Sequence, residues 1–185
     1  MINGFGNSNL IILAGRPGMG KTAFSLNIVE HVAIDHGMPV GIFSLEMSAE
    51  QLRDRMICSQ SEVESSKIQT GSLNSSEYQC VVQAAVAIQK APIFIHDQPG
   101  LNITDLCNSA REMKELHDIK LIIIDYLQII SILPNYNCIS DDKYKDITEL
   151  ARILKTLARE LSIPILCGSQ LSRQVEERTG HRPAC

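Results

Sequence analysis

A chain of 185 residues, 44% of them hydrophobic, is long enough to fold as one domain with a substantial core. Its formal net charge of −4 excludes a global basic field for nucleic acid, so any such binding has to rest on a local patch. No apolar run reaches the ~20 residues that span a bilayer and no signal peptide opens the chain, so we expect a cytoplasmic protein without membrane partners.

The first expected element is a buried strand over residues 10–14, a short apolar run. It leads directly into residues 15–22, which match the pattern G-x-x-x-x-G-K-[ST] at every fixed position. Helix-compatible sequence with apolar spacing follows and ends at a stop signal over residues 36–39. The order of strand, glycine loop and helix favours a phosphate-binding loop over a glycine-rich turn of no chemical consequence.

Each residue type in this loop has a physical reason. Backbone N–H groups wrap a triphosphate only where no Cβ blocks the approach, which places Gly15, Gly18 and Gly20 at the tight positions. The following helix points its positive N-terminal end at the phosphates. Lys21 provides a mobile charge for the β- and γ-phosphates, and Thr22 offers a hydroxyl ligand to Mg²⁺. We expect ATP to bind the whole loop, which consists of Gly15, Arg16, Pro17, Gly18, Met19, Gly20, Lys21 and Thr22.

Four more apolar strands alternate with helices along the rest of the chain. We expect these strands at residues 40–44, 93–96, 121–125 and 165–168. A capping-box pattern starts a helix at residue 48, and further helices are expected at 74–89, from 102 or 104 to about 117, and at 144–161. Residues 131–142 read as an irregular polar loop. This alternation predicts an α/β fold with a parallel sheet covered on both faces, and chemistry beyond the carboxyl ends of its strands.

Polar residues stand at the ends of these strands. Asp125 closes the most hydrophobic strand, where a carboxylate can hold a phosphate-bound Mg²⁺ opposite Thr22 or merely cap a loop. Glu46 follows the second strand and can activate the attacking water, although spacing alone favours an acidic residue ahead of a helix. Gln170, after the last strand, can sense the γ-phosphate, although alone it would be interpreted as an ordinary loop glutamine. Asp97 is interpreted as a turn residue before a Pro-Gly pair.

The remaining polar residues indicate little chemistry. The five histidines are scattered and predict no metal site, and the six cysteines lie too far apart for a CxxC metal or redox motif. The basic residues between positions 173 and 182 are nearly cancelled by Glu176 and Glu177, which favours a solvated face.

Four stretches occur together in a fixed order: GRPGMGKT at 15–22, FSLEMS at 43–48, IDYLQ at 124–128 and SQLSR at 169–173. In order and separation they resemble the RecA-like ATPase domain of bacterial replicative helicases of the DnaB type. The resemblance covers residues 9–183 and implies a three-layer α/β/α RecA-like P-loop fold with a mostly parallel sheet. It implies that Lys21 and Thr22 bind phosphate and Mg²⁺ and that Asp125 holds the metal. It also implies that Glu46 is the catalytic base and that Gln170 couples the nucleotide state to DNA-binding loops.

The family forms hexameric rings around single-stranded DNA and couples ATP hydrolysis to translocation and strand separation during replication. We therefore expect residues 1–185 to be one ATP-hydrolysing domain of a DNA helicase, with Mg²⁺ as cofactor and with single-stranded DNA and helicase subunits as partners. A recombinase-type or clock-type RecA relative is a further option, against which residues 44–47 and 125–128 argue.

Parts of the family pattern have no counterpart in the sequence. The N-terminal domain and linker helix are expected before residue 1. A DNA-contacting loop, further strands and the arginine that completes a neighbour's ATP site are expected after residue 183. The loop after Asp125 carries Asp141 and Asp142 against Lys143 and Lys145, which weakens the expected contact with DNA. The sheet is therefore expected to be incomplete on its C-terminal side, and the chain to bind ATP but hydrolyse it feebly. The alternative function is a truncated, non-catalytic nucleotide-binding module that associates with a full-length helicase or another partner.

Overall fold

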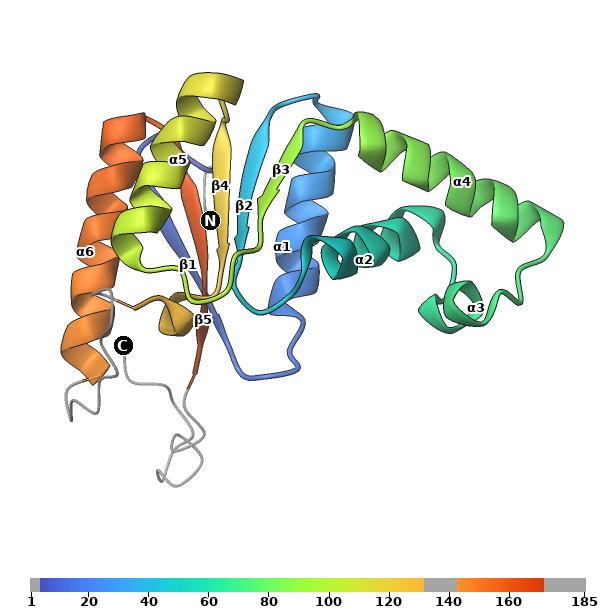
Figure 1. The fold of residues 1–185 in the computed structure, drawn as a ribbon, viewed down its shortest axis with the longest axis horizontal. Helices are drawn as coiled ribbons and strands as arrows, with labels where there is room; N and C mark the ends of the chain where they lie inside the picture. Colours follow the sequence, from blue (N-terminus) through green and yellow to red (C-terminus); the bar gives the residue numbers. More distant parts are fainter. Residues whose placement is uncertain (1–3, 132–142, 172–185) are drawn as a thin grey trace.

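A parallel sheet stands at the centre of the protein (Figure 1). The computed structural model describes residues 4–131 and 143–171. The strands lie in the order β1-β5-β4-β2-β3, and every pairing between them is parallel, as predicted. The strands of the described residues are β1 (Leu10–Gly15), β2 (Val40–Ser44), β3 (Ile93–His96), β4 (Leu121–Asp125) and β5 (Ile165–Gln170).

Helices connect the strands and begin where their capping residues predict. Ser48 and Gln51 form one capping box, and Asn74 and Glu77 form another. Asn102, the earlier of the two expected starts, caps the helix that precedes β4. The helical elements of the described residues are α1 (Lys21–Glu30), η1 (His31–Asp35), α2 (Ala49–Ser61), α3 (Ser65–Thr70), α4 (Ser75–Lys90), α5 (Ile103–His117), η2 (Leu127–Ile129) and α6 (Lys143–Leu161).

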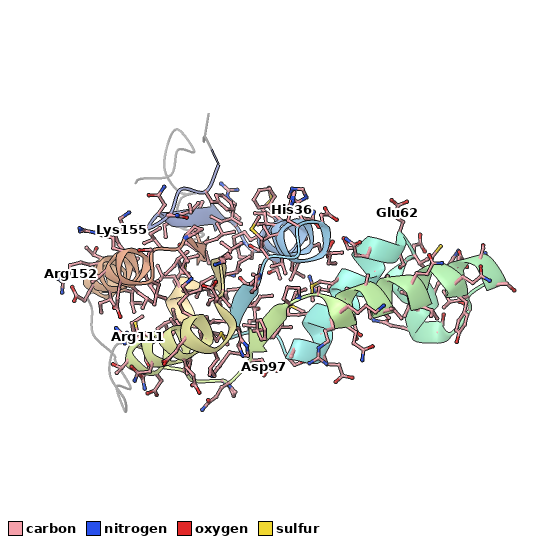
Figure 2. All side chains as sticks on the ribbon, turned by 90° about the horizontal axis from the view of Figure 1, so that it is seen from above. His36, Glu62, Asp97, Arg111, Arg152 and Lys155 are labelled. Atoms are coloured by element: carbon pink, nitrogen blue, oxygen red, sulfur yellow. The ribbon has the colours of Figure 1, made fainter. Side chains whose placement is uncertain are left out.

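The sheet lies between two helical layers because successive strand residues point to opposite faces. Ile122 and Ile124 of β4 pack in the core beneath α5 and α6. Leu121 and Ile123 of the same strand pack with residues of α1 and α2 instead. Figure 2, seen from above, shows α1 on one side of the sheet and α5 with α6 on the other. The predicted three-layer α/β/α arrangement is therefore confirmed.

An arm made of α2, α3 and α4 extends past the edge strand β3 (Figure 1). Asp97, which follows β3, fixes the start of this arm: its Oδ2 accepts a 2.7 Å hydrogen bond from the backbone N–H of Ala49. The carboxylate therefore caps the first turn of α2 across 48 positions of sequence. Sequence spacing assigned Asp97 to its own turn, because a cap from so distant a strand leaves no local pattern.

Three local features differ from the predictions. β5 continues through Ser169 and Gln170, which pair with Ala14 and Gly15 of β1, so both residues end the strand rather than follow it. The helix after the glycine loop changes into a π-helical turn, η1, before the stop signal. Residues 65–70 form a further short helix, α3, where the sequence predicted none: residues 59–66 were interpreted as a polar, serine-rich stretch and the residues up to 71 as a short apolar piece.

Other expectations fall outside the described residues. These are the polar loop from residue 132 to residue 142 and the basic C-terminal residues. Within residues 4–131 and 143–171, no helix combines the length and apolar character that a membrane span needs.

Candidate active site

Four predicted site segments meet beyond the carboxyl ends of adjacent strands, at the lower edge of the sheet in Figure 1. Gly15 at the end of β1 pairs with Gln170 at the end of β5. Ser44 at the end of β2 pairs with Asp125 at the end of β4. Because β5 and β4 are neighbours, the glycine loop, Gln170, Asp125 and the segment after Ser44 share one edge.

The glycine loop joins β1 to α1 in a conformation that suits an anion. Gly18 and Gly20 have φ angles of 76° and 79°, in the left-handed region that favours glycine. A Cβ at either position would meet no atom within 4 Å, so the backbone conformation, and not crowding, requires glycine there. The first turn of α1 has no acidic residue and no side-chain cap. Its N–H groups and positive end are therefore directed at the loop without a protein anion to satisfy them.

Lys21 folds back over the loop. Its Nζ donates hydrogen bonds to the backbone carbonyls of Gly15, at 2.9 Å, and Arg16, at 3.1 Å. A Cβ on Gly15 would lie 3.3 Å from Lys21 Cγ, so this glycine leaves room for the lysine stem. The ammonium group is thereby held at the mouth of the loop, where a phosphate can replace the carbonyls as its acceptor.

Thr22 and Asp125 contact each other directly across the site. The hydroxyl Oγ1 of Thr22 donates a 2.7 Å hydrogen bond to Oδ2 of Asp125, which is 9% exposed. The other carboxylate oxygen, Oδ1, faces Gly168 of β5, where a Cβ would approach it to 3.1 Å. Burial, followed by the charge of Asp125, raises the pKa of the adjacent Cys167 thiol to about 12. Cys167 is therefore a neutral thiol beside the Asp125 carboxyl group.

Glu46 lies on the same edge with its side chain exposed to solvent. The backbone N–H of Leu45 donates to the carbonyl of Asp125 at 3.0 Å, which extends the pairing of β2 with β4 past the strands and up to Glu46. The charges of Glu46 and Asp125 both affect the pKa of Tyr126. Burial raises the pKa of its phenol first, and the charges of Glu46 and Asp125 raise it further. The bond between Leu45 and Asp125 therefore brings Glu46 to the edge of the sheet where Asp125 lies.

Gln128, the last residue of the 124–128 stretch, for which the sequence predicted no specific role, is hydrogen-bonded to the end of β5. Its Nε2 donates to Ser169 Oγ at 2.9 Å and to the carbonyl of Gln170 at 3.0 Å, and its Oε1 accepts from the backbone N–H of Gln170 at 3.1 Å. Gln128 follows β4 in the 3₁₀ turn η2, so these bonds join the ends of β4 and β5. Its place three residues after Asp125 was the available signal, but a polar residue in a turn has no local mark of a distant partner.

Two oxygen ligands are available for a metal at this edge, the Thr22 hydroxyl and the Asp125 carboxylate. Within the described ranges no group of three or more His, Cys, Asp or Glu side chains could hold a metal ion. A pair of hard oxygen ligands fits Mg²⁺ that arrives with a nucleotide, because phosphate oxygens and waters supply the remaining positions.

A protein-family model agrees with this arrangement: the model described as the DnaB-like helicase C terminal domain matches residues 1–185. The chain belongs to this family. A DnaB-family relative, the replicative DNA helicase DnaB of Nostoc sp., is 41% identical over 99% of this chain and 20% of the relative. The DnaB of Geobacillus stearothermophilus is 40% identical over 99% of this chain and 40% of its own length. The chain thus spans less than half the length of these curated relatives.

Solved structures agree with the DnaB-like assignment. One of them, described as an ATPase domain, has a TM-score of 0.84 and 30% identity, over 96% of this chain and 62% of that chain. A DnaB-like replicative helicase, solved in a study of its interactions with primase, has a TM-score of 0.86 and 29% identity, over 98% of this chain and 43% of that chain. A KaiC-like protein from Pyrococcus horikoshii, with a TM-score of 0.60 and 19% identity, shows a shared fold alone. The predicted resemblance to DnaB-type helicases and the RecA-like fold are confirmed.

Proposed function

We propose that the chain is the ATP-binding and ATP-hydrolysing motor domain of a replicative DNA helicase. One observation carries this proposal: the Thr22 hydroxyl and the Asp125 carboxylate lie 2.7 Å apart beside an open glycine loop. Membership of the DnaB-like family supports it, because the relatives are replicative DNA helicases and a similar structure is an ATPase domain.

Thr22 and Asp125 would hold the Mg²⁺ that accompanies ATP. Held there, the ion would supply positive charge to the phosphates of ATP during transfer of the γ-phosphoryl group to water. Lys21 would exchange the carbonyls of Gly15 and Arg16 for phosphate oxygens, since its ammonium group has three rotatable donors. The amides of the loop and of the first turn of α1 would bind the remaining phosphate charge.

Glu46 would orient the attacking water and accept its proton. Its side chain is exposed, and the backbone bond from Leu45 to Asp125 places Glu46 at the same edge of the sheet as Asp125. A positioned general base contributes about 10²–10⁴-fold to a rate. Gln170 ends β5 beside the glycine loop, where its side-chain amide could sense the γ-phosphate, and Gln128 fixes its backbone.

Single-stranded DNA and other helicase subunits are the proposed partners. Family membership supports this part of the proposal, because ATP-driven unwinding belongs to the whole helicases that the chain matches in part.

Steady-state ATP hydrolysis, measured at rising protein concentration with and without single-stranded DNA, tests the motor function. Turnover that rises with both variables supports a domain that works in a subunit assembly on DNA. If ATP binds while turnover stays at background under all these conditions, the hydrolysing motor is contradicted, and a non-catalytic nucleotide-binding module is the better account.

A further inference from the structure

Two histidines meet at the end of the α1–η1 segment that lies away from the glycine loop. The Nε2 atoms of His31 and His36 are 3.2 Å apart, and their rings pack edge to face with centroids 4.6 Å apart. Nδ1 of His31 lies 2.8 Å from Oδ2 of Asp35. All three side chains are exposed, and Figure 2 shows His36 at the surface beside α1. The proposed ATP site uses none of them.

The π-helical turn η1 causes this meeting. In a regular α-helix, residues five apart point about 140° away from each other around the axis. A π-helix bonds residue i to residue i+5, which brings residues at this spacing to the same side. His31 is the first residue of η1 and His36 is its C-cap. Scattered histidines in the sequence predicted no metal site because the sequence pattern did not predict this local change of helix type.

The distance between the two Nε2 atoms suits two ligands of one tetrahedral metal ion. Zinc–nitrogen bonds of 2.0–2.1 Å at tetrahedral angles place two imidazole nitrogens about 3.3–3.4 Å apart. The observed separation of 3.2 Å lies close to this value. In the metal-free protein the same separation is that of an N–H···N hydrogen bond between the rings.

Asp35 selects the nitrogen of His31 that faces His36. When Nδ1–H of His31 donates to the carboxylate, Nε2 keeps its lone pair. In that tautomer, an Nε2–H of His36 can donate to the lone pair across the 3.2 Å separation. On metal binding, the neutral His36 ring carries its proton on Nδ1 instead, which frees its Nε2 lone pair without a change of charge. A carboxylate behind a metal-bound imidazole orients the ring and raises its basicity.

We propose that His31 and His36 bind a divalent transition-metal ion, with Zn²⁺ as the best fit, and that Asp35 is the positioning residue for His31. Imidazole nitrogen suits zinc, copper and nickel, whereas Mg²⁺ prefers oxygen, so this site and the ATP site select different ions. Waters complete the coordination shell, because no third His, Cys, Asp or Glu among the described residues could act as a metal ligand together with the two histidines. The ion clamps the end of the helical segment whose first residues are Lys21 and Thr22.

Calorimetric titration of the full chain with Zn²⁺, in excess Mg²⁺, tests the proposal. The wild type is expected to bind one more zinc ion than the double variant His31→Ala/His36→Ala. Asp35→Asn is expected to keep this ion with affinity about tenfold weaker or more, because its amide cannot support the imidazole as a carboxylate does. His117→Ala is the matched control. It removes another exposed imidazole, stacked on Phe94 at 3.8 Å, and should leave zinc binding unchanged.

Histidine ring resonances of the wild-type protein give a second readout that needs no variant to fold. Zinc should shift the signals of His31 and His36 and leave that of His117 in place. Zinc should also raise the melting midpoint of the wild type, since a ligand of the folded state stabilises it, and should do so less in the double variant. The proposal is overturned if the double variant binds as many zinc ions as the wild type. It is also overturned if zinc leaves the ring resonances of His31 and His36 unshifted.

Discussion

The Thr22 hydroxyl donates a 2.7 Å hydrogen bond to the Asp125 carboxylate across 103 positions of sequence. The two residues belong to the helix after β1 and to the end of β4, and β5 runs between these strands. Contact across an intervening strand is possible because β5 carries Gly168 at the crossing point, where a Cβ would lie 3.1 Å from Asp125 Oδ1. The absence of a side chain at Gly168 therefore leaves room for the Asp125 carboxylate, the proposed metal ligand.

Asp125→Asn keeps a hydrogen-bond acceptor for Thr22 and removes the negative charge. We expect Mg²⁺-dependent ATP binding and turnover to fall by at least about tenfold, because a neutral amide is a poorer ligand for a hard cation. Nucleotide binding titrated with Mg²⁺ and with a chelator measures the effect. Asp118→Asn is the control: Asp118 is exposed at the opposite end of β4, and Asn tolerates its φ of 48°. Equal losses of Mg²⁺-dependent ATP binding and turnover in the two variants would contradict a role of Asp125 as metal ligand.

Gly168→Ala tests whether ATP binding depends on the space beside Asp125 that the absent side chain of Gly168 leaves. The added Cβ must displace the Asp125 carboxylate, so we expect weaker binding of ATP with Mg²⁺. Gly41→Ala is a matched control, because a Cβ there is similarly crowded, at 3.2 Å from Ile119 and 3.3 Å from Met113, but in the core away from the site. Crowding costs of about 1–3 kcal/mol are offset in part by about 0.5–1 kcal/mol from the lost flexibility of glycine. Denaturant unfolding should therefore show similar stabilities, while nucleotide titration separates the two variants. Unchanged binding in Gly168→Ala would refute the steric argument.

Glu30 predicts a dependence of stability on pH that is separate from the active site. Its side chain is 5% exposed, accepts from Ser59 Oγ and Gln60 Nε2, and leaves Oε1 without a hydrogen-bond partner. Burial raises the pKa of this carboxyl above its ordinary value, and the two hydrogen bonds offset the rise in part. Between pH 4.5 and the raised pKa, the folded protein therefore holds a proton that the unfolded chain has already released. The free energy of unfolding contributed by Glu30 falls as pH rises from about 4.5 through the raised pKa.

Glu30→Gln removes this titration while keeping size and an acceptor oxygen. We expect the variant to gain stability relative to the wild type as pH rises from about 4.5 to about 8, measured by urea unfolding at several pH values. For Glu112→Gln, at an exposed position on α5, the free energy of unfolding should change with pH as it does in the wild type. If the free energy of unfolding of Glu30→Gln also changes with pH as in the wild type, burial does not raise the pKa of the Glu30 carboxyl.

Local sequence patterns predicted most of the fold because strands, caps and the glycine loop are encoded by neighbouring residues. Residues 40–44 and 121–125 were predicted with the bounds that β2 and β4 have, and the capping box at Ser48 with Gln51 was predicted from its spacing. The rule that chemistry gathers at the carboxyl ends of parallel strands predicted that Asp125 and Thr22 would meet.

Features that depend on distant partners could not be predicted in this way. The insertion of β5 between β1 and β4, the space left by Gly168 and the bonds from Gln128 to the end of β5 arise from strand order, which a local pattern does not encode. The π-helical turn that pairs His31 with His36 is a local change with no simple residue signature. The catalytic function of Glu46 and the sensing function of Gln170 stay predictions that experiment has to test.

Single-turnover hydrolysis of ATP with Mg²⁺, with protein in excess, tests the central claim most directly when wild type, Glu46→Gln and Glu50→Gln are compared. Glu50 is a matched control because it is also exposed and lies in the first turn of α2. We predict that all three proteins bind ATP, and that Glu46→Gln alone hydrolyses it at least about 100-fold more slowly, because a general base contributes about that much. Equal hydrolysis rates in wild type and Glu46→Gln would contradict the assignment of this site as the ATPase centre.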